Sequence, residues 1–289
     1  MKKKFLALML SALMILSLAA CGGGDDTADQ TGDGAGTEEP AGDGQTYTVG
    51  IIQQMQHVAL DAATEGFQAA LTEKLGDSVT IEFENASGDP SNYSTIANNF
   101  VSQNVDLIMA NGTSALQAAA STTSTIPILG TSITEYGVAL GIDDFTGVTG
   151  YNVSGTSDLA PLDQQAAMLQ EWFPEAQTVG LLYCSAEPNS QYQVDTVQGY
   201  LEEAGITCTQ YSFSDSNDIS AVATTACTEN DVIYVPTDNT AANNAELLGN
   251  ISLDTQTPII AGEEGICRGC GVATLTISYY DIGYATGEM

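Results

Sequence analysis

The fold is decided by the stretch from residue 47 to residue 75, which reads YTVGIIQQMQHVALDAATEGFQAALTEKL. Its first part, 47–52, is a short and nearly continuous apolar run, which is typical of a strand buried on both faces of a parallel sheet. Its second part, 60–75, repeats apolar residues at helical spacing. A buried strand followed by such a helix is the repeating unit of an α/β protein.

The same unit recurs through the rest of the chain. Further strands are predicted at 79–83, 106–110, 126–129, 148–153, 178–183, 206–211, 232–236, 258–261 and 272–277, and further helices at 93–101, 114–120, 159–172, 191–204, 219–227, 241–253 and from Tyr279 onward. This alternation predicts an α/β fold of doubly wound parallel sheets. Its two halves predict two lobes, one of 47–150 with 272–289 returning to it, the other of 151–271. The strand at 148–153 is expected to cross between the lobes, which are joined near 150–155 and again near 262–271.

The N-terminus carries an export signal. Three lysines at 2–4 precede an apolar run at 5–20, which is too short and wrongly flanked for a membrane span. The run ends in Leu18-Ala19-Ala20-Cys21, which resembles the bacterial lipobox. Residues 1–20 are therefore predicted to be a signal peptide and Cys21 to be lipidated; ordinary cleavage after Ala20 is the alternative.

Charge narrows the choice of partners. The next segment, 21–46, is acidic and has almost nothing to bury, so it is predicted to be a disordered tether. The whole chain has 5 basic and 37 acidic residues, a net charge of -32, which excludes nucleic acid as a partner. Beyond residue 20 only Lys74 and Arg268 are basic. A ligand carboxylate would therefore meet backbone N–H groups, hydroxyls or Arg268.

The cysteines suggest no metal site. Those after Cys21 are Cys184, Cys208, Cys227, Cys267 and Cys270. The C-x-x-C spacing of the last two is compatible with half a zinc site, but no second pair and no nearby histidine supply the other ligands. The expected roles are small core fillers or one local disulfide, with no metal and no cofactor.

Polar residues follow the predicted strands. Because open α/β sheets bind ligands beyond the carboxyl ends of their strands, these residues are the candidate ligand site. They are Gln53, His57, Thr113, Ser114, Thr131, Thr134, Glu187, Asn189, Ser190, Asp238, Asn239 and Glu263, with Asp281 in the last helix.

Two of these groups are expected to hold the ends of a zwitterion. The helix beginning at Thr113-Ser114 offers free N–H groups to a carboxylate. Asp238 is expected to take an ammonium group, with Asn239, Asn189 and Glu187 as neighbours; if Asp238 is only a helix cap, Glu187, Glu263 or Asp281 takes that role. Helix capping is the competing interpretation for each of these turns.

Catalysis has little support in the sequence. His57 is the only histidine, so any Ser-His-Asp device must use it. Neither a G-x-S-x-G elbow nor a phosphate-binding G-x-x-x-x-G-K-[ST] loop occurs. Glu263 and Glu264 are adjacent and hence divergent. No enzymatic activity is expected.

Seven stretches resemble the ABC-transporter substrate-binding proteins that take up tryptophan and other aromatic amino acids. They are 50–53 with 57–61, 106–108 with Thr113 and Gln117, 152–158, 185–190, 234–239, 262–265 and 279–283. The resemblance implies a two-lobed, type I periplasmic-binding-protein-like fold with three crossovers, no enzymatic activity, and an ABC permease and ATPase as partners. It also implies that the last helix returns to the first lobe and is cut short at Met289. Gln54, Met55 and Gln56 depart from a more apolar stretch in that family.

Together these features predict a monomeric, exported lipoprotein on the outer face of the cell membrane. It would capture a small amino-acid-like ligand, aromatic or not, in the cleft between its lobes and deliver it to an ABC importer. The same cleft would also serve a ligand-sensing protein of a membrane receptor, and an α/β enzyme is a third alternative.

Overall fold

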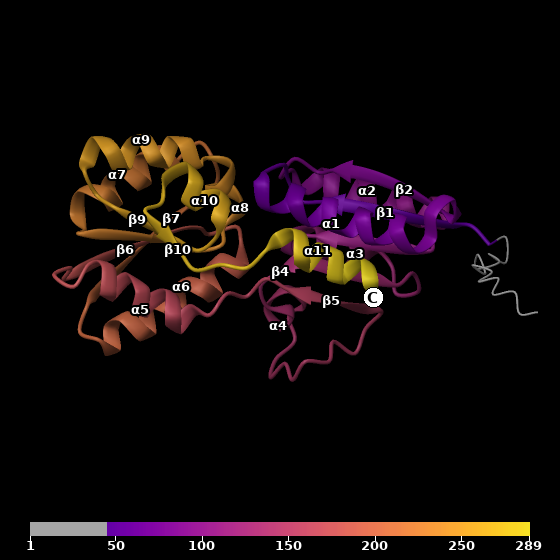
Figure 1. Ribbon diagram of the computed structural model, residues 1–289, viewed down its shortest axis with the longest axis horizontal. Coiled ribbons are helices and arrows are strands. Elements are labelled where there is room, and N and C mark those ends of the chain that lie inside the picture. The colour runs from indigo at the N-terminus through magenta and orange to yellow at the C-terminus, as the bar shows by residue number, and fades with distance from the viewer. Residues whose placement is uncertain (1–44) are drawn as a thin grey trace, which may run out of the picture. The chain divides into compact units, whose positions relative to one another are not determined.

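The computed structural model describes residues 45–289 (Figure 1), so the export signal, Cys21 and nearly all of the tether lie outside the described residues. Within 45–289, no helix has both the length and the apolar character needed to cross a bilayer. The signal peptide, tether and lipidation remain predictions.

The first sheet has five parallel strands in the order β2-β1-β3-β4-β5. Its strands and associated helices are β1 (Tyr47–Gln53), α1 (Val58–Leu75), β2 (Val79–Asn85), α2 (Pro90–Gln103), β3 (Leu107–Asn111), α3 (Thr113–Thr122), β4 (Ile128–Ile133), α4 (Tyr136–Leu140) and β5 (Val153–Ser157), with a single 3-10 turn at Gly76–Ser78. Val49 and Ile51 pack against Phe67 of α1 on one face, and Ile52 packs with Phe100 of α2 on the other. Burial on both faces explains the continuous apolar run of β1.

The second sheet repeats this plan in the order β10-β9-β8-β6-β7, again all parallel. Its elements are α5 (Leu162–Trp172), β6 (Thr178–Cys184), α6 (Pro188–Glu203), β7 (Thr207–Phe213), α7 (Ile219–Glu229), β8 (Val232–Val235), α8 (Asn239–Asn243), α9 (Ala245–Thr255), β9 (Ile259–Ala261), α10 (Glu264–Cys270) and β10 (Ala273–Thr274). One face packs on α5 and α6, and the other on α7, α9 and α10. The predicted doubly wound α/β architecture is confirmed.

The last helix, α11 (Tyr279–Glu288), packs against α1 of the first sheet, as Figure 1 shows. Glycines make this close crossing possible. A Cβ on Gly283 would lie 1.9 Å from the Ala63 carbonyl oxygen, and one on Gly66 would lie 2.1 Å from the Tyr280 carbonyl oxygen. Gly283 therefore serves packing in this helix, although glycine has a low intrinsic helix propensity.

The two sheets divide the chain a few residues later than the sequence predicted. The strand expected at 148–153 begins only at Val153, and β5 pairs with β4 of the first sheet, so that sheet extends to Ser157. Gly147 and Gly150 have positive φ, and Val148 is 75% exposed, so this apolar stretch has turn geometry and nothing to pack against. At the other end, the strand expected at 272–277 shortens to β10, which pairs with β9 in the second sheet.

Three short helical features differ from the predictions. The single helix expected at 241–253 is two helices that meet at Asn244, whose φ of -117 and ψ of 18 are not helical. Helix α4 and helix α10 were not predicted from the sequence. Each begins with a glutamate N-cap, Glu135 or Glu263, and is only five or seven residues long, which is too short to show helical periodicity.

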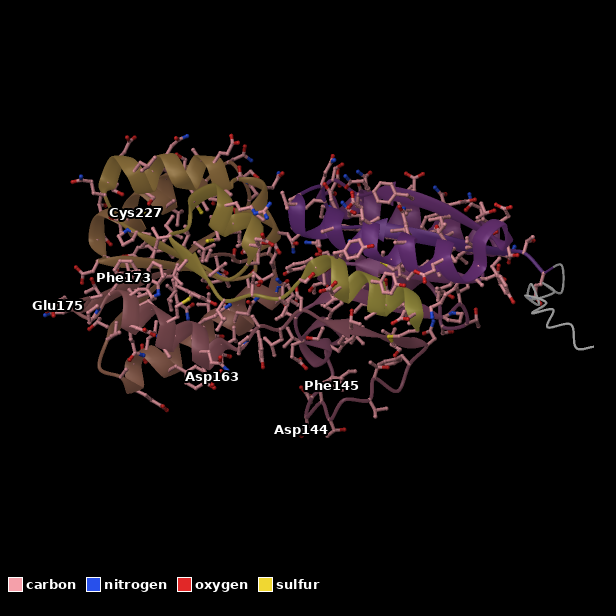
Figure 2. The ribbon with its side chains drawn as sticks, viewed as in Figure 1. Asp144, Phe145, Asp163, Phe173, Glu175 and Cys227 are labelled. Carbon is pink, nitrogen blue, oxygen red and sulfur yellow. The ribbon has the colours of Figure 1, made fainter. Side chains whose placement is uncertain are left out.

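The five cysteines of the described part of the chain are all free thiols. Cys227, labelled in Figure 2, is buried with Cys184 in the core beneath α7 and α9, and Cys267 and Cys270 pack against the same core. They are core fillers in this structure, and the local disulfide is not formed. Among residues 45–289, no cluster of histidine, cysteine, aspartate and glutamate is arranged to hold a metal ion.

Candidate ligand site

Buried polar atoms without partners gather at one kind of place in this fold. Within the described residues, six buried side-chain atoms lack a hydrogen-bond partner, and each lies at or just beyond the carboxyl end of a strand. They are His57 Nδ1 after β1, Asn111 Oδ1 on β3, Ser132 Oγ on β4, Asp158 Oδ1 after β5, Asn189 Oδ1 after β6 and Thr274 Oγ1 on β10. Buried polar groups are normally satisfied, so this pattern marks the strand ends as the candidate site for a ligand.

The end of β1 is tied firmly to α1 and β3. Gln53 Oε1 accepts from Thr64 Oγ1 at 2.7 Å, and Gln53 Nε2 donates to Asp61 Oδ1 at 2.7 Å. Asn111 Nδ2 donates to the Leu60 carbonyl at 2.8 Å and to Thr64 Oγ1 at 3.0 Å. With a further bond from Gln53 Nε2 to the Met55 carbonyl at 2.9 Å, both N–H groups of the Gln53 amide are used, and the oxygen of Asn111 has no partner. Gln53 therefore positions the site, and Asn111 presents an acceptor to it.

The N-terminus of α3 is already partly occupied by a side chain. Gly112, with φ of 102, provides no cap, and Gln54 Oε1 instead accepts from the Ser114 N–H at 2.9 Å. Gln54 is 2% exposed, and Thr113 is buried beside it. The amide oxygen thus stands where the sequence predicted a ligand carboxylate, and Gln54 remains able to donate from Nε2.

The end of β4 has a strained backbone. Ser132 has φ of 56, a conformation that costs a residue with a Cβ about 1–2 kcal/mol. The pairing of β4 with β5 shifts between Gly130 and Ile133 around it. Thr131 and Thr134 are buried on either side; Thr131 Oγ1 meets Thr156 Oγ1 at 3.4 Å, and the Thr134 carbonyl accepts from Ser157 Oγ. Such strain recurs at ligand sites.

In the second lobe, carboxylates fix the start of α8. Glu187 Oε1 accepts from the Thr240 N–H at 2.8 Å and from Thr240 Oγ1 at 2.7 Å, and its Oε2 accepts from the Asn239 N–H and Nδ2 at 3.1 and 2.7 Å. Asp238 accepts from the Ala241 N–H at 2.8 Å and from the Cys184 N–H at 2.7 Å. Both Asp238 oxygens already accept hydrogen bonds. Its contacts therefore fit the helix-cap interpretation better than the ammonium-binding one.

The surroundings of Asp238 favour its neutral form. Burial, and then the charge of Glu187, raise the pKa of Asp238 to about 7, against two backbone hydrogen bonds that lower it. Asn189 Nδ2 and Ser190 Oγ both lie within hydrogen-bonding distance of the Thr237 carbonyl, which leaves Asn189 Oδ1 without a partner.

One hydrogen bond links the two lobes through His57. His57 Nε2 lies 3.0 Å from Asn239 Oδ1, and Asn239 in turn contacts Glu187. His57 precedes α1, so the bond joins the strand end of β1 to the start of α8. Its Nδ1 is buried and unpartnered.

A second acidic group lies where the chain leaves the first sheet. Asp158 is 3% exposed; its Oδ2 accepts from the Tyr279 hydroxyl at 2.9 Å, and its Oδ1 is free. Burial raises the pKa of Asp158, and Glu263 raises it further. Glu263 is 1% exposed, and burial likewise raises its pKa, although it caps α10 through the N–H groups of Gly265 and Ile266.

A cavity of about 440 Å³ opens between the strand ends of the two sheets, a volume suited to a small ligand. Its lining residues are Gln54, Met55, Gln56, Asn85, Ser87, Gly88, Pro90, Tyr93, Ser114, Cys184, Ala186, Glu187, Ser214, Asp215, Ser216, Thr240 and Asn243. Of the predicted site residues only Ser114 and Glu187 line it. Tyr93 supplies an aromatic wall. Burial and the charge of Glu187 raise the pKa of its hydroxyl.

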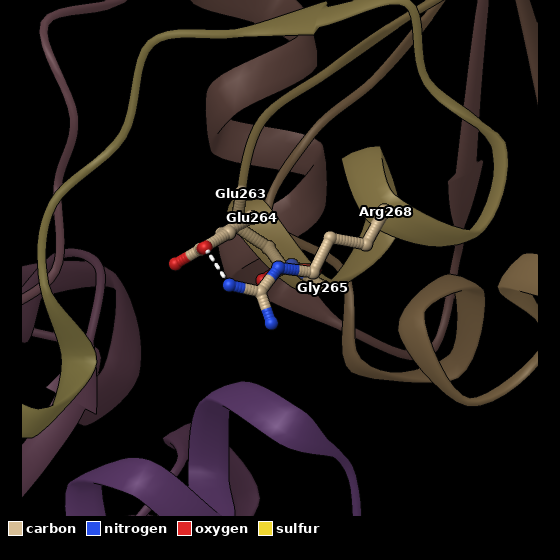
Figure 3. A network of polar contacts seen from close by, with 4 residues as sticks. All are labelled: Glu263, Glu264, Gly265 and Arg268. Carbon is tan, nitrogen blue, oxygen red and sulfur yellow. Dashed lines mark hydrogen bonds and ion pairs between the residues drawn. The ribbon is translucent and has the colours of Figure 1, made fainter.

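Two charged residues considered in the sequence lie elsewhere. Asp281 is exposed in the first turn of α11. The exposed Arg268 pairs with Glu264 one helical turn away, and Figure 3 shows its guanidinium directed to that carboxylate. Arg268 lines a different cavity, of about 520 Å³, beside His57 and α9.

Sequence reasoning missed Gln54, Tyr93, Ser132, Asp158 and Tyr279. Asp158 and Tyr279 stood inside stretches that carried the family resemblance, and Asp158 directly follows a strand. Ser132 follows a predicted strand, but its positive φ gave no signal, because that conformation depends on the bulge between β4 and β5.

Known proteins resemble this chain over nearly its whole described length. The model of the ABC transporter substrate-binding protein family matches residues 48–289. A tyrosine-binding protein of Clostridioides difficile (strain R20291) is 33% identical over 292 residues, covering 99% of this chain and 83% of that protein.

Solved structures agree with this match. An ABC domain from Streptococcus pneumonia in complex with L-Trp is 32% identical, with a TM-score of 0.81 over 85% of this chain and 83% of that one. The ligand-free, open structure of a substrate-binding protein with adhesive properties from Clostridium difficile is 35% identical, with a TM-score of 0.60 over 84% and 83%. A leucine-binding protein from Thermotoga maritima, 16% identical with a TM-score of 0.62 over 83% and 80%, shows the fold alone. The predicted family resemblance and type I periplasmic-binding-protein-like fold are confirmed.

Proposed function

The chain belongs to the ABC transporter substrate-binding protein family, and we propose that it is an extracytoplasmic receptor that binds an amino acid in the interlobe cleft and delivers it to an ABC importer. The family consists of solute-binding proteins and not of enzymes. The observation that carries the proposal is the set of six unpartnered buried polar atoms at strand ends of both sheets.

The cleft offers complementary groups to both ends of a zwitterion. The α3 N-terminus, with Gln54 and Ser114 beside it, supplies donors and a positive dipole end for a carboxylate. Asp158, Glu263 and Glu187 supply negative charge for an ammonium group. The described chain forms only two ion pairs, Lys74–Glu288 and Arg268–Glu264, so none of these buried carboxylates has a basic partner. A bound cation would balance them.

Relatives suggest an aromatic side chain for the ligand. One relative is a tyrosine-binding protein, and a solved relative holds L-Trp. In this chain the 440 Å³ cavity and Tyr93 provide room and an aromatic wall.

Calorimetry on the chain from residue 22 onward tests this function. L-Tyrosine, L-tryptophan and L-phenylalanine are titrated alongside L-leucine, a polar L-amino acid and a hexose. Saturable, one-to-one binding of an L-amino acid is expected. Binding of the sugar, with no heat from any amino acid, would refute the proposed ligand class.

Anchoring is part of the same proposal and has its own test. The lipobox-like Leu18-Ala19-Ala20-Cys21 motivates it. In a bacterial host, the wild-type chain should fractionate with membranes and label with a fatty-acid probe, whereas Cys21→Ala should be released. Cys208→Ala, at a partly buried position far along the chain, is the matched control and should stay with the membranes. Equal membrane retention of Cys21→Ala would exclude lipid anchoring through this residue.

A further inference from the structure

The hydrogen bonds around Asn239 determine which way its amide faces. Four donors are directed at the Glu187 carboxylate, and one of them is Asn239 Nδ2 at 2.7 Å. A carboxylate can only accept, so the nitrogen of the Asn239 amide must face Glu187. The amide oxygen is thereby directed to His57 Nε2, 3.0 Å away.

This orientation fixes the proton of His57. An amide oxygen can only accept, so His57 Nε2 must carry the proton that it donates to Asn239. In the neutral ring, the other nitrogen is then a bare acceptor. That nitrogen, Nδ1, is buried and has no partner among the described residues. A buried acceptor without a hydrogen-bond partner destabilises the protein, and a donor on the ligand would remove that cost.

His57 borders a cavity of about 520 Å³ that Arg268 also lines, and buried acidic groups act on the same region. Glu263 lies within electrostatic reach of both His57 and Asp158, and the Asp158 Oδ1 is itself buried without a partner. A cavity of about 140 Å³ lies against Glu263 and Tyr279 and is bordered by Val58 and Ala59, which directly follow His57 in the chain. Asp158 and Glu263 have no basic partner among residues 45–289, and neither Asp158 Oδ1 nor His57 Nδ1 has a hydrogen-bond partner there.

We propose that His57 is a specificity-determining residue in its neutral form: the Glu187–Asn239 relay holds its proton on Nε2, and its Nδ1 accepts a hydrogen bond from the primary ammonium group of the ligand. The inference rests on the proposed function, because it assigns one end of the amino acid. It also makes His57 the residue through which ligand binding in the first lobe is coupled to α8 of the second.

Two substitutions of His57 by amide side chains test the roles of its two ring nitrogens separately. The amide nitrogen of His57→Gln can take the place of Nε2 and keep the bond to Asn239, but it offers no acceptor at Nδ1. The amide of His57→Asn can supply an acceptor near Nδ1, but it is too short to reach Asn239. The ligand pair is L-tyrosine and 3-(4-hydroxyphenyl)propanoate, which differ only in the ammonium group.

The expected result is a loss of binding affinity whose size depends on both the variant and the ligand. A hydrogen bond to a charged group contributes about 1.5–3 kcal/mol, so His57→Gln should weaken L-tyrosine roughly 10- to 150-fold. It should leave the propanoate within about threefold of its wild-type affinity, and His57→Asn should retain most of the L-tyrosine affinity. Equal losses for the two ligands, or wild-type affinity of His57→Gln for L-tyrosine, would overturn the proposal.

A second measurement needs no amino acid and so separates this inference from the proposed function. His57 is the only histidine, so ¹⁵N spectra of histidine-labelled protein carrying a histidine-free tag contain one ring. The free protein should show the Nε2-protonated form, and methylammonium chloride should shift the Nδ1 signal. Asn239→Leu should remove the tautomer preference, whereas Asn250→Leu on the exposed side of α9 should not. An Nδ1-protonated ring, or no response to methylammonium, would overturn the inference even if amino acids bind.

Discussion

The two lobes share a topology but differ in what they bury at their strand ends. The buried polar side chains of the first lobe, up to Thr134, are all uncharged amides and hydroxyls. All four buried carboxylates of the described chain, Asp158, Glu187, Asp238 and Glu263, come after β5. Both sheets are parallel and carry helices on both faces, so the fold does not impose this difference.

The difference shows how a protein almost without basic residues can orient a zwitterion. In the proposed binding mode, N–H groups and the dipole of α3 hold the carboxylate, and His57 together with the carboxylates that follow β5 holds the ammonium group. A ligand bound this way would touch both lobes, which favours closure around it. Two kinds of substitution therefore test this difference between the lobes. One removes a buried carboxylate after β5, and the other adds a charge among the uncharged groups of the first lobe.

The largest effect is expected from neutralising Asp158. Asp158→Asn keeps the size of the side chain and one acceptor for the Tyr279 hydroxyl, but it removes a buried charge. Loss of a desolvated charge partner costs about 2–5 kcal/mol of binding, roughly thirtyfold to several thousandfold in Kd. Calorimetry with L-tyrosine measures the loss. Asp281→Asn, at an exposed position on α11, is the control and should bind normally; a comparable loss there would show that the site has been misplaced.

The second effect comes from charging the neutral side. Gln54→Glu keeps an acceptor for the Ser114 N–H and adds a negative charge at the α3 N-terminus. The ligand carboxylate should then be repelled by about 2 kcal/mol, roughly thirtyfold in Kd. Tyramine, which lacks the carboxylate, serves as the control ligand and should bind the variant at least as well as the wild type. Weaker tyramine binding, matching the loss for L-tyrosine, would place the carboxylate elsewhere.

The sequence predicts the architecture better than the site. Strands such as β1 and β6 are buried on both faces, and their apolar runs reveal them without knowledge of their neighbours. Residues 148–152 gave a false strand, because apolar character alone does not reveal that Val148 and Tyr151 lack a covering helix. The expected helix at 241–253 is interrupted at Asn244, and the weak helix propensity of the two asparagines there was not used.

The sequence indicates which polar residues lie at strand ends. It does not show which residues they contact, because those contacts join segments far apart in the chain. Glu187, Asn189 and Asp238 were found by position, but Asp238 spends both oxygens on backbone N–H groups and Glu187 on the start of α8. Asp158 was passed over although it follows a strand. Only three-dimensional pairing shows which polar atoms remain free.

A third, smaller effect concerns the stability of the ligand-free protein, to which the buried carboxyl group of Asp238 contributes. Because the pKa of Asp238 is raised from 3.8 to about 7 in the folded chain, the native state binds more protons than the unfolded state between these values. The free energy of unfolding should therefore fall as pH rises from about 4 to about 7. Asp238→Asn should flatten this fall, and Asp254→Asn, exposed on α9, should not. Urea denaturation at several pH values gives the slopes, and identical slopes in wild type and Asp238→Asn would argue against a buried charge there.

The smallest effect belongs to the neutral side, at Ser132. Glycine adopts a φ of 56 without a Cβ penalty, so Ser132→Gly should stabilise the free protein by about 1 kcal/mol, equivalent to a rise in Tm of roughly 2–4 °C. The same change removes the free hydroxyl and should weaken L-tyrosine a few fold, if Ser132 Oγ contacts the ligand. Ser132→Ala separates the two effects, because it deletes the hydroxyl but keeps the strain. Ser132→Gly should therefore melt higher than Ser132→Ala while binding L-tyrosine equally weakly. A Ser132→Gly variant that is less stable than Ser132→Ala would mean that the backbone is not strained. The first lobe would then form its part of the site without the backbone strain that the φ of Ser132 indicates.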